Sequence, residues 1–248
     1  MSAVPNISPV IEHLRRQLLR CQIAHSTQAI ISSGYQSFDQ LLPESGLPSG
    51  SVIEWISDTP GLRATTIALR CAAGFLEKPG ALAVVDSFND FHPMSLSHLG
   101  IPLSRLLLVR PCCSSTAVLS QAERSAALWA LEQLARCPGV RVMMTWIDRL
   151  SPTAQRRLQL AVEKSGVTVF LMRPATALRQ TSWADLRFCV QSSAPTETTS
   201  SHITVRLVRS KNSVQRHGQV LLDCNHETGH VLEASELADP ASAKTAAC

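Results

Sequence analysis

The sequence predicts an α/β protein: a mostly parallel sheet with helices on both faces and a small antiparallel hairpin towards the C-terminus. The first observation is that short, almost wholly apolar segments alternate with helical segments through the middle of the chain. This alternation is typical of βαβ units around a buried parallel sheet. The second is a strand, a small-residue loop and a helix in succession over residues 52–77, the layout of a phosphate-binding loop.

The composition bounds the class of protein. A chain of 248 residues holds one large α/β domain or two small ones, and its 45% apolar and 17% charged residues suit a soluble globular protein. It has no run of about 18 apolar residues for a membrane span. Glu12, His13 and nearby arginines argue against a secretory signal. The eight cysteines are scattered without a C-x-x-C pair, which favours buried thiols in the cytoplasm. The net charge of +4 permits contact with nucleic acid but does not argue for it.

Residues 1–32 are expected to form an N-terminal arm, with an amphipathic helix over residues 8–24. Ser8-Pro9 supplies a helix cap and a first-turn proline. The apolar side carries Ile11, Leu14, Leu18 and Cys21, and the basic side carries Arg15, Arg16 and Arg20. The helix either docks on the core or reaches a neighbouring subunit or DNA. Docking is favoured because amphipathic helices usually serve packing.

Five apolar strands separated by helices are expected to share one sheet in a core domain that spans residues 33–232. The strands are residues 52–56, 81–85, 106–109, 140–146 and 167–172. The helices are residues 63–77, 95–99, 118–136 and 152–164. Pro-Gly pairs end the first and third helices, and Ser151-Pro152 begins the last one.

The C-terminal part of the chain changes from buried to half-buried strands. Residues 186–190 are strand-like, and the Ser/Thr/Pro-rich residues 191–201 are expected to form a loop. Residues 203–208 and 219–223 alternate apolar and polar side chains, which predicts an antiparallel hairpin at the sheet edge. The Ala/Ser-rich tail, residues 233–248, is expected to be disordered.

The phosphate-loop layout lacks most of the residues that bind a nucleotide. Where a G-x-x-x-x-G-K-S/T motif would lie, residues 57–64 read Ser-Asp-Thr-Pro-Gly-Leu-Arg-Ala. Both anchor glycines, the lysine and the hydroxyl are replaced. The residues that could still contact a nucleotide are Ser57, Gly61, Arg63 and Thr65. A shifted loop that uses Gly61 as its last glycine places Leu62 at the lysine position.

Several blocks in the first half of the chain follow a characteristic order. Residues 33–42 read Ser-Gly-Tyr-Gln-Ser-Phe-Asp-Gln-Leu-Leu, and residues 46–50 read Gly-Leu-Pro-Ser-Gly. Further blocks follow at residues 84–86, 92–100 and 106–111. Together they resemble the start of the RecA ATPase core. The resemblance implies a RecA-like P-loop NTPase core, and the ordered blocks make it more specific than a lone glycine motif.

Four more blocks lie in the second half. They are Ala-Leu-Trp-Ala-Leu-Glu-Gln at residues 127–133, Trp-Ile-Asp-Arg-Leu-Ser-Pro at 146–152, Arg-Arg-Leu-Gln-Leu-Ala-Val-Glu at 156–163 and Phe-Leu-Met-Arg-Pro at 170–174. They resemble the ImuA family, the RecA-like accessory proteins of bacterial error-prone translesion synthesis. This resemblance implies a scaffold in the SOS response to DNA damage. Its implied partners are a Y-family-like polymerase homologue and an error-prone C-family DNA polymerase, with RecA as a further candidate and indirect contact with DNA.

Hydrolysis by a RecA-type ATPase also needs a general-base glutamate after the second strand and an acidic residue at the end of the fourth. Aligned to the RecA pattern, these positions hold Phe88 and Trp146. We therefore predict no catalytic residue, no ATP hydrolysis and no cofactor, with weak ATP binding left open. The alternative is a divergent RecA-like ATPase that acts in DNA recombination or its regulation. Some relatives carry a cell-division inhibitor label, to which the sequence gives no separate support.

Three arginines are candidate contacts for a protein partner: Arg156, Arg157 and Arg173. Of the first two, which share a helix, one is expected to face solvent and the other to pair with Glu163 or a partner. Arg173 ends the fifth strand, at the edge where ligands of parallel sheets gather. It is open whether it meets an acidic partner, a phosphate or only the edge of the cleft.

The remaining polar residues are given structural roles. Asp86 is expected to cap the turn that follows it. Arg63 is expected to pair with Asp58 or Asp86, which would close the loop without a nucleotide. The irregular spacing of Cys224, His226, His230 and His217 does not fit a zinc site, so no metal is predicted.

Overall fold

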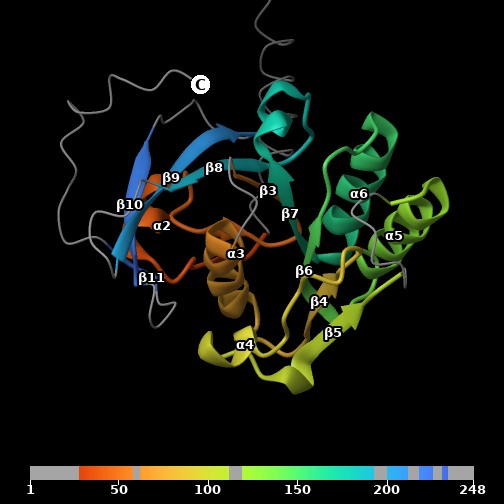
Figure 1. Ribbon diagram of the computed structural model, residues 1–248, viewed down its shortest axis with the longest axis horizontal. Coiled ribbons are helices and arrows are strands. Elements are labelled where there is room, and N and C mark those ends of the chain that lie inside the picture. Colours follow the sequence, from red (N-terminus) through yellow and green to blue (C-terminus); the bar gives the residue numbers. More distant parts are fainter. Residues whose placement is uncertain are drawn as a thin grey trace, which may run out of the picture.

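The computed structural model describes residues 28–57, 62–111, 119–192, 200–211, 218–225 and 231–233. Within these ranges, one sheet of nine strands has the order β11-β10-β9-β8-β3-β7-β6-β4-β5 (Figure 1). Its strands are β3 (Val52–Ser57), β4 (Ala81–Val85), β5 (Leu106–Val109), β6 (Val140–Trp146), β7 (Thr168–Pro174), β8 (Leu186–Ser192), β9 (Ser200–Ser210), β10 (Gln219–Asn225) and β11 (Val231–Glu233). The expected arm over residues 8–24 lies outside the described residues, as does the expected disordered tail except for Glu233, which belongs to β11 and corrects the start of that tail.

The sheet is parallel from β5 to β8 and antiparallel beyond β8. The five strands expected to share one sheet do so, as β3 to β7. β9 and β10 form the expected antiparallel hairpin. The hairpin is not the edge of the sheet, however, because β11 pairs outside β10. A three-residue strand is too short to show an alternating pattern, which is why the sequence did not reveal β11.

Helices cover both faces of the sheet, as expected. The described helices are α2 (Gln36–Leu41), α3 (Leu62–Phe75), α4 (Ser95–His98), α5 (Gln121–Leu134) and α6 (Pro152–Ser165), with 3₁₀ turns η1 (Leu103–Arg105) and η2 (Ala175–Arg179). α2 and α3 pack in one apolar core, and α5 and α6 pack in the other (Figure 1). These two cores place any ligand site at the ends of the strands rather than on a sheet face.

Local sequence signals set where α5 and α6 begin. Ser120 caps α5: its hydroxyl accepts from the Glu123 amide at 3.3 Å, and its own amide donates to the Glu123 carboxylate at 2.7 Å. This reciprocal capping box starts the helix at residue 121, three residues later than expected. α6 begins as predicted, with Ser151 as the cap and Pro152 in the first turn.

The block at residues 33–42 has a structural role. The Asp39 carboxylate accepts hydrogen bonds from the Ser33 amide at 2.8 Å and the Ser32 hydroxyl at 2.6 Å. Gly34 lies between them with a φ of 86°, which favours glycine. The Asp39 bonds hold the chain entry against α2, and β1 (Ile30–Ile31) pairs with β2 (Leu47–Pro48) just before and after it. The sequence did not predict this small second sheet.

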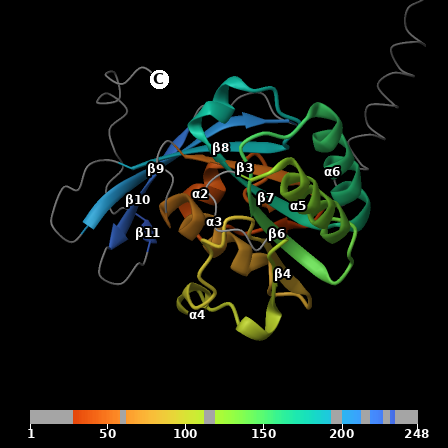
Figure 2. The same ribbon diagram turned by 45° about the vertical axis from the view of Figure 1, so that its right-hand side comes forward.

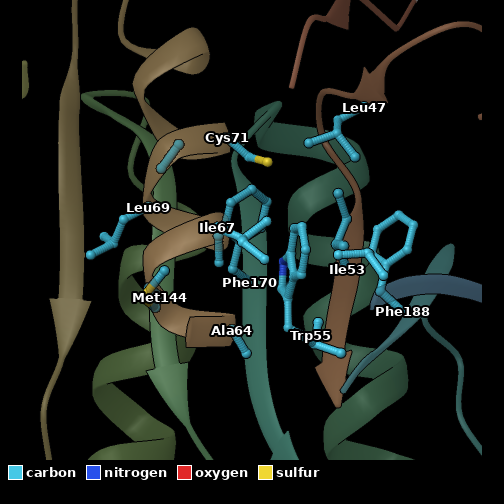
Figure 3. Close-up of a cluster of buried hydrophobic side chains, with 14 of the residues drawn as sticks. Leu47, Ile53, Trp55, Ala64, Ile67, Leu69, Cys71, Met144, Phe170 and Phe188 are labelled. Atoms are coloured by element: carbon cyan, nitrogen blue, oxygen red, sulfur yellow. The ribbon is translucent and has the colours of Figure 1, made fainter. Parts of the chain in front are cut away.

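An aromatic cluster fills the core between α3 and the sheet (Figure 3). The Trp55 ring lies 4.9 Å from Phe188 and 5.8 Å from Phe170, measured between centroids. Phe38 reaches the same cluster, 5.0 Å from Phe188. All four side chains are fully buried. The central strand β3 therefore packs against α2, α3 and its two neighbouring strands.

The described cysteines are mostly buried thiols, as the sequence predicts. Cys71, Cys189 and Cys224 are buried, whereas Cys137 is exposed and contradicts the expectation for that residue. Cys137 follows the end of α5, next to a Pro-Gly turn on the surface. Burial raises the pKa of the Cys71 thiol and keeps it protonated. None of the helices in the described ranges has the length and apolarity to cross a bilayer.

Candidate functional site

The carboxyl ends of the parallel strands are where α/β proteins bind ligands. β3 ends at Ser57, and α3 begins at Leu62 after a loop that is not described. Of the candidate nucleotide contacts, Gly61 therefore lies outside the described residues. Arg63 and Thr65 are half-buried in the first turn of α3.

Asp86 caps the turn after β4, as the sequence predicts. Its carboxylate accepts from the backbone amides of Asp90 at 3.2 Å and Phe91 at 3.3 Å. Its ion pair is with Arg110, 3.0 Å away, and not with Arg63 as expected. The register explains this partner. β4 and β5 are neighbours with Val85 opposite Val109, so the next residues of the two strands, Asp86 and Arg110, meet.

Arg63 lies near Cys224 of β10, towards the opposite end of the sheet from Asp86. Burial raises the pKa of the Cys224 thiol on β10, and the nearby Arg63 guanidinium opposes that rise. β10 is six places from β4 in the sheet order, so Arg63 cannot reach both. Its other expected partner, Asp58, lies outside the described residues.

Phe88 and Trp146 are the two positions that the RecA sequence pattern aligns with the carboxylates of a RecA-type ATPase. Trp146 ends β6 and packs on Phe91, with ring centroids 5.9 Å apart. Phe88 is half-buried in the turn that Asp86 caps. An indole or a phenyl ring can neither take a proton from water nor ligate Mg²⁺. The side chains at these two positions therefore cannot perform the general-base and metal-holding steps of phosphoryl transfer.

A buried ion cluster, which the sequence did not reveal, joins β3, β7 and β8. Glu54 on β3 lies 2.6 Å from the Arg173 guanidinium and 2.7 Å from that of Arg187. Ser182 donates a third hydrogen bond to Glu54 at 2.8 Å. These side chains are almost fully buried. The available signal was a glutamate inside the apolar strand Val-Ile-Glu-Trp-Ile, since a buried carboxylate needs a partner.

The single Glu54 carboxylate cannot satisfy all the donors of two guanidinium groups, and neutral oxygens accept the remaining hydrogen bonds. Arg173 also donates to the Asp148 carbonyl at 2.9 Å and the Gln180 amide oxygen at 2.6 Å. Arg187 donates to the Ala177 carbonyl at 2.7 Å. The Arg173 guanidinium is therefore engaged inside the protein, where a partner cannot reach it. Its proposed role as a partner contact is replaced by a structural one.

The other two candidate arginines lie on the outer face of α6. Arg157 pairs with Glu132 of α5 at 3.3 Å. Arg156 lies over the Trp183 ring, 5.4 Å from its centroid. The expected pairing with Glu163 is wrong for both, because Glu163 faces Lys211 of the C-terminal region at 3.6 Å. Both arginines are exposed and remain candidates for a partner contact.

A polar groove of about 590 Å³ is lined by residues of α2, α3, α4 and β11. Its lining includes Tyr35, Thr66, Arg70, His98 and Glu233. Glu233 also accepts a hydrogen bond from the Ser37 amide at 2.6 Å, which ties β11 to α2.

Metal binding has no support in the described ranges, where no three His, Cys, Asp or Glu side chains converge. His217, His226 and His230 lie outside those ranges.

Comparison with known proteins points to RecA. No protein-family model matches the chain. It is 34% identical to Protein RecA of Lactiplantibacillus pentosus over 88 residues, which is 36% of this chain and 23% of that protein. Protein RecA of Malacoplasma penetrans is 34% identical over 82 residues, covering 33% and 25%, and that of Rhodopirellula baltica is 32% identical over 88 residues, covering 36% and 23%.

The aligned segment spans about a quarter of the length of these RecA proteins. The mixed nine-strand sheet, with its parallel core and antiparallel extension, is consistent with a RecA-like core. Fold and sequence similarity together support a relation to the RecA-like superfamily, at a distance from RecA itself.

Proposed function

We propose that this protein is an ImuA-type scaffold for error-prone translesion DNA synthesis, which does not hydrolyse ATP and acts in the cytoplasmic response to DNA damage. Similarity to RecA supports a role connected with DNA repair or recombination. The finer assignment comes from the ImuA-like blocks at residues 127–133, 146–152, 156–163 and 170–174. Its partners are a Y-family-like polymerase homologue and an error-prone C-family polymerase, with RecA as a further candidate. Contact with DNA is indirect.

The single observation that carries the loss of hydrolysis is the aromatic character of the two catalytic positions. Trp146 is engaged with Phe91, and Phe88 sits in a turn fixed by Asp86 and Arg110. Restoring activity would take more than one carboxylate, because the phosphate loop has also lost its lysine and hydroxyl. A core that keeps its fold without this chemistry is suited to holding partners together.

A divergent ATPase is the second candidate function. Arg63 and Thr65 favour it, because the first turn of α3 is where a phosphate-binding cation and a hydroxyl would lie. In this reading the protein binds ATP weakly through Arg63 and acts in recombination or its regulation. The two candidates differ in whether ATP is turned over.

We expect purified protein to release phosphate from Mg-ATP no faster than buffer does, with or without single-stranded DNA. The physical reason is that no general base or metal ligand occupies the Phe88 and Trp146 positions. A RecA protein assayed in parallel is the positive control. DNA-stimulated hydrolysis that disappears in the Arg63→Ala variant would contradict the scaffold and favour the divergent ATPase.

A further inference from the structure

The outer faces of α5 and α6, which lie side by side on one face of the sheet, form one exposed surface (Figure 2). We name it the α5–α6 surface; its residues are Trp129 of α5, Arg136 just after it, Arg156, Arg157 and Leu160 of α6, and Trp183 of the segment before β8, over which Arg156 lies. The apolar members are unusually open to solvent: Trp129 is 66% exposed, Leu160 48% and Trp183 45%. Three large apolar side chains on one face need an explanation, since scattered single ones do not.

Helical spacing and one shared carboxylate make these residues a continuous surface. Leu160 follows Arg156 and Arg157 by four and three positions, so the three lie on one face of α6. On α5, Glu132 stands between Trp129 and Arg136 in the same way. The Glu132 carboxylate lies 3.3 Å from Arg157 and 3.9 Å from Arg136. This carboxylate bridge joins the two helix faces.

The composition of the surface is that of a protein-binding hot spot. Tryptophan and arginine are the residue types enriched where partner proteins bury most of their binding energy. Arg156 lies over the Trp183 ring and donates to the Gln159 amide oxygen at 3.2 Å. Its charge is thus held in place by neutral groups. Because the Arg156 and Trp183 side chains are already ordered against each other, they lose little conformational entropy when a partner binds.

Charge decides which occupant fits. Three arginines face one glutamate, so the surface is positive and favours an acidic segment. The arm at residues 8–24 carries Arg15, Arg16 and Arg20, and it would be repelled. Nucleic acid is disfavoured by Arg156, which covers one face of the Trp183 ring. Base stacking needs an open ring face.

We propose that the α5–α6 surface binds an acidic segment of a partner protein that inserts apolar side chains beside Leu160 and the two tryptophans. This inference rests on the proposed function, which supplies the partner: the Y-family-like polymerase homologue. Carboxylates of the segment pair with Arg156 and Arg157, and its apolar residues cover Trp129, Leu160 and Trp183. Such a segment would bind as an amphipathic helix does, with its apolar face against the surface.

The test is the affinity of the full chain for the polymerase homologue encoded in the same genome, measured by titration calorimetry. We expect Leu160→Asp and Arg156→Glu each to weaken binding at least about tenfold, as for hot-spot residues. Two matched controls lie elsewhere on the exposed surface. Met94→Asp changes an apolar residue that is 68% exposed, and Arg206→Glu reverses an exposed charge on β9. Both controls should change the affinity less than about twofold.

The outcomes separate this inference from the function on which it rests. If the polymerase binds the wild-type chain and both surface variants equally well, the α5–α6 surface is excluded while the scaffold stands. If it does not bind the wild-type chain, both fail. Loss of single-stranded DNA binding in the variants, with polymerase binding intact, would make this a nucleic-acid surface. A dimer that Leu160→Asp converts to a monomer in sedimentation would make the occupant a second copy. Either result overturns the proposal.

Discussion

Replacing Glu54 by glutamine is expected to lower the free energy of unfolding by about 3–5 kcal/mol, the usual cost of breaking a buried ion pair from one side. The substitution keeps the shape of the side chain but removes the charge between Arg173 and Arg187. Two guanidinium groups would then stay buried without a carboxylate, 2.6 and 2.7 Å from the neutral amide. Urea unfolding at 25 °C, followed by tryptophan fluorescence, measures the change.

Glu163→Gln is the matched control for this substitution. Glu163 also forms an ion pair, with Lys211 at 3.6 Å, but both side chains are about one-third exposed. Pairs that solvent reaches contribute at most about 1 kcal/mol. A loss below about 1 kcal/mol in Glu54→Gln would show that the cluster does not hold β3, β7 and β8 together.

Truncating Trp55 to alanine is expected to cost about 3–5 kcal/mol of unfolding free energy. The ring is fully buried at the centre of the aromatic cluster, with Phe188 at 4.9 Å, Phe170 at 5.8 Å and Phe38 at 6.0 Å (Figure 3). Its neighbours come from α2, β7 and β8, so they cannot all close on the cavity. Domains of this size are typically stable by only about 5–15 kcal/mol. Thermal and urea unfolding should therefore both shift strongly.

Trp129→Ala provides the control for loss of an indole. Trp129 is mostly exposed on α5, so its removal should change stability by less than about 0.5 kcal/mol. Equal losses at Trp55 and Trp129 would contradict the assignment of Trp55 to the core. A small loss at Trp55 alone would mean that the cluster collapses on the cavity.

The strands of the parallel core were predictable because their short apolar sequences are typical of buried strands. β4, β5 and β6 have the predicted bounds, since each is an apolar run between turn residues. β9 is longer than expected, Ser200–Ser210 against 203–208, because its flanking polar residues pair with β8 and β10. Backbone hydrogen bonds to neighbouring strands extend a strand beyond its apolar stretch, and the composition of the strand does not predict this extension.

The side-chain partners could not be predicted in the same way. Asp86 meets Arg110 because β4 and β5 lie in register, and Arg157 meets Glu132 because α5 and α6 are neighbours. These pairs join residues about 24 or more apart in the sequence, and only the topology brings them together. The expectation for Arg173 was wrong for the same reason. Its position at a strand end indicated a ligand contact, whereas Glu54 lies on the adjacent strand.

The scaffold function is tested most directly by the affinity of this protein for the Y-family-like polymerase homologue with and without Mg-ATP. A scaffold without ATP chemistry should bind equally well in both conditions, and millimolar Mg-ATP should leave its melting temperature unchanged. ATP at about 100 times its dissociation constant would stabilise the protein by about 2.7 kcal/mol, which is easily measured. Binding that requires ATP, accompanied by an ATP-dependent rise in melting temperature, would contradict the scaffold function. The protein would then be a RecA relative whose partner binding is controlled by nucleotide.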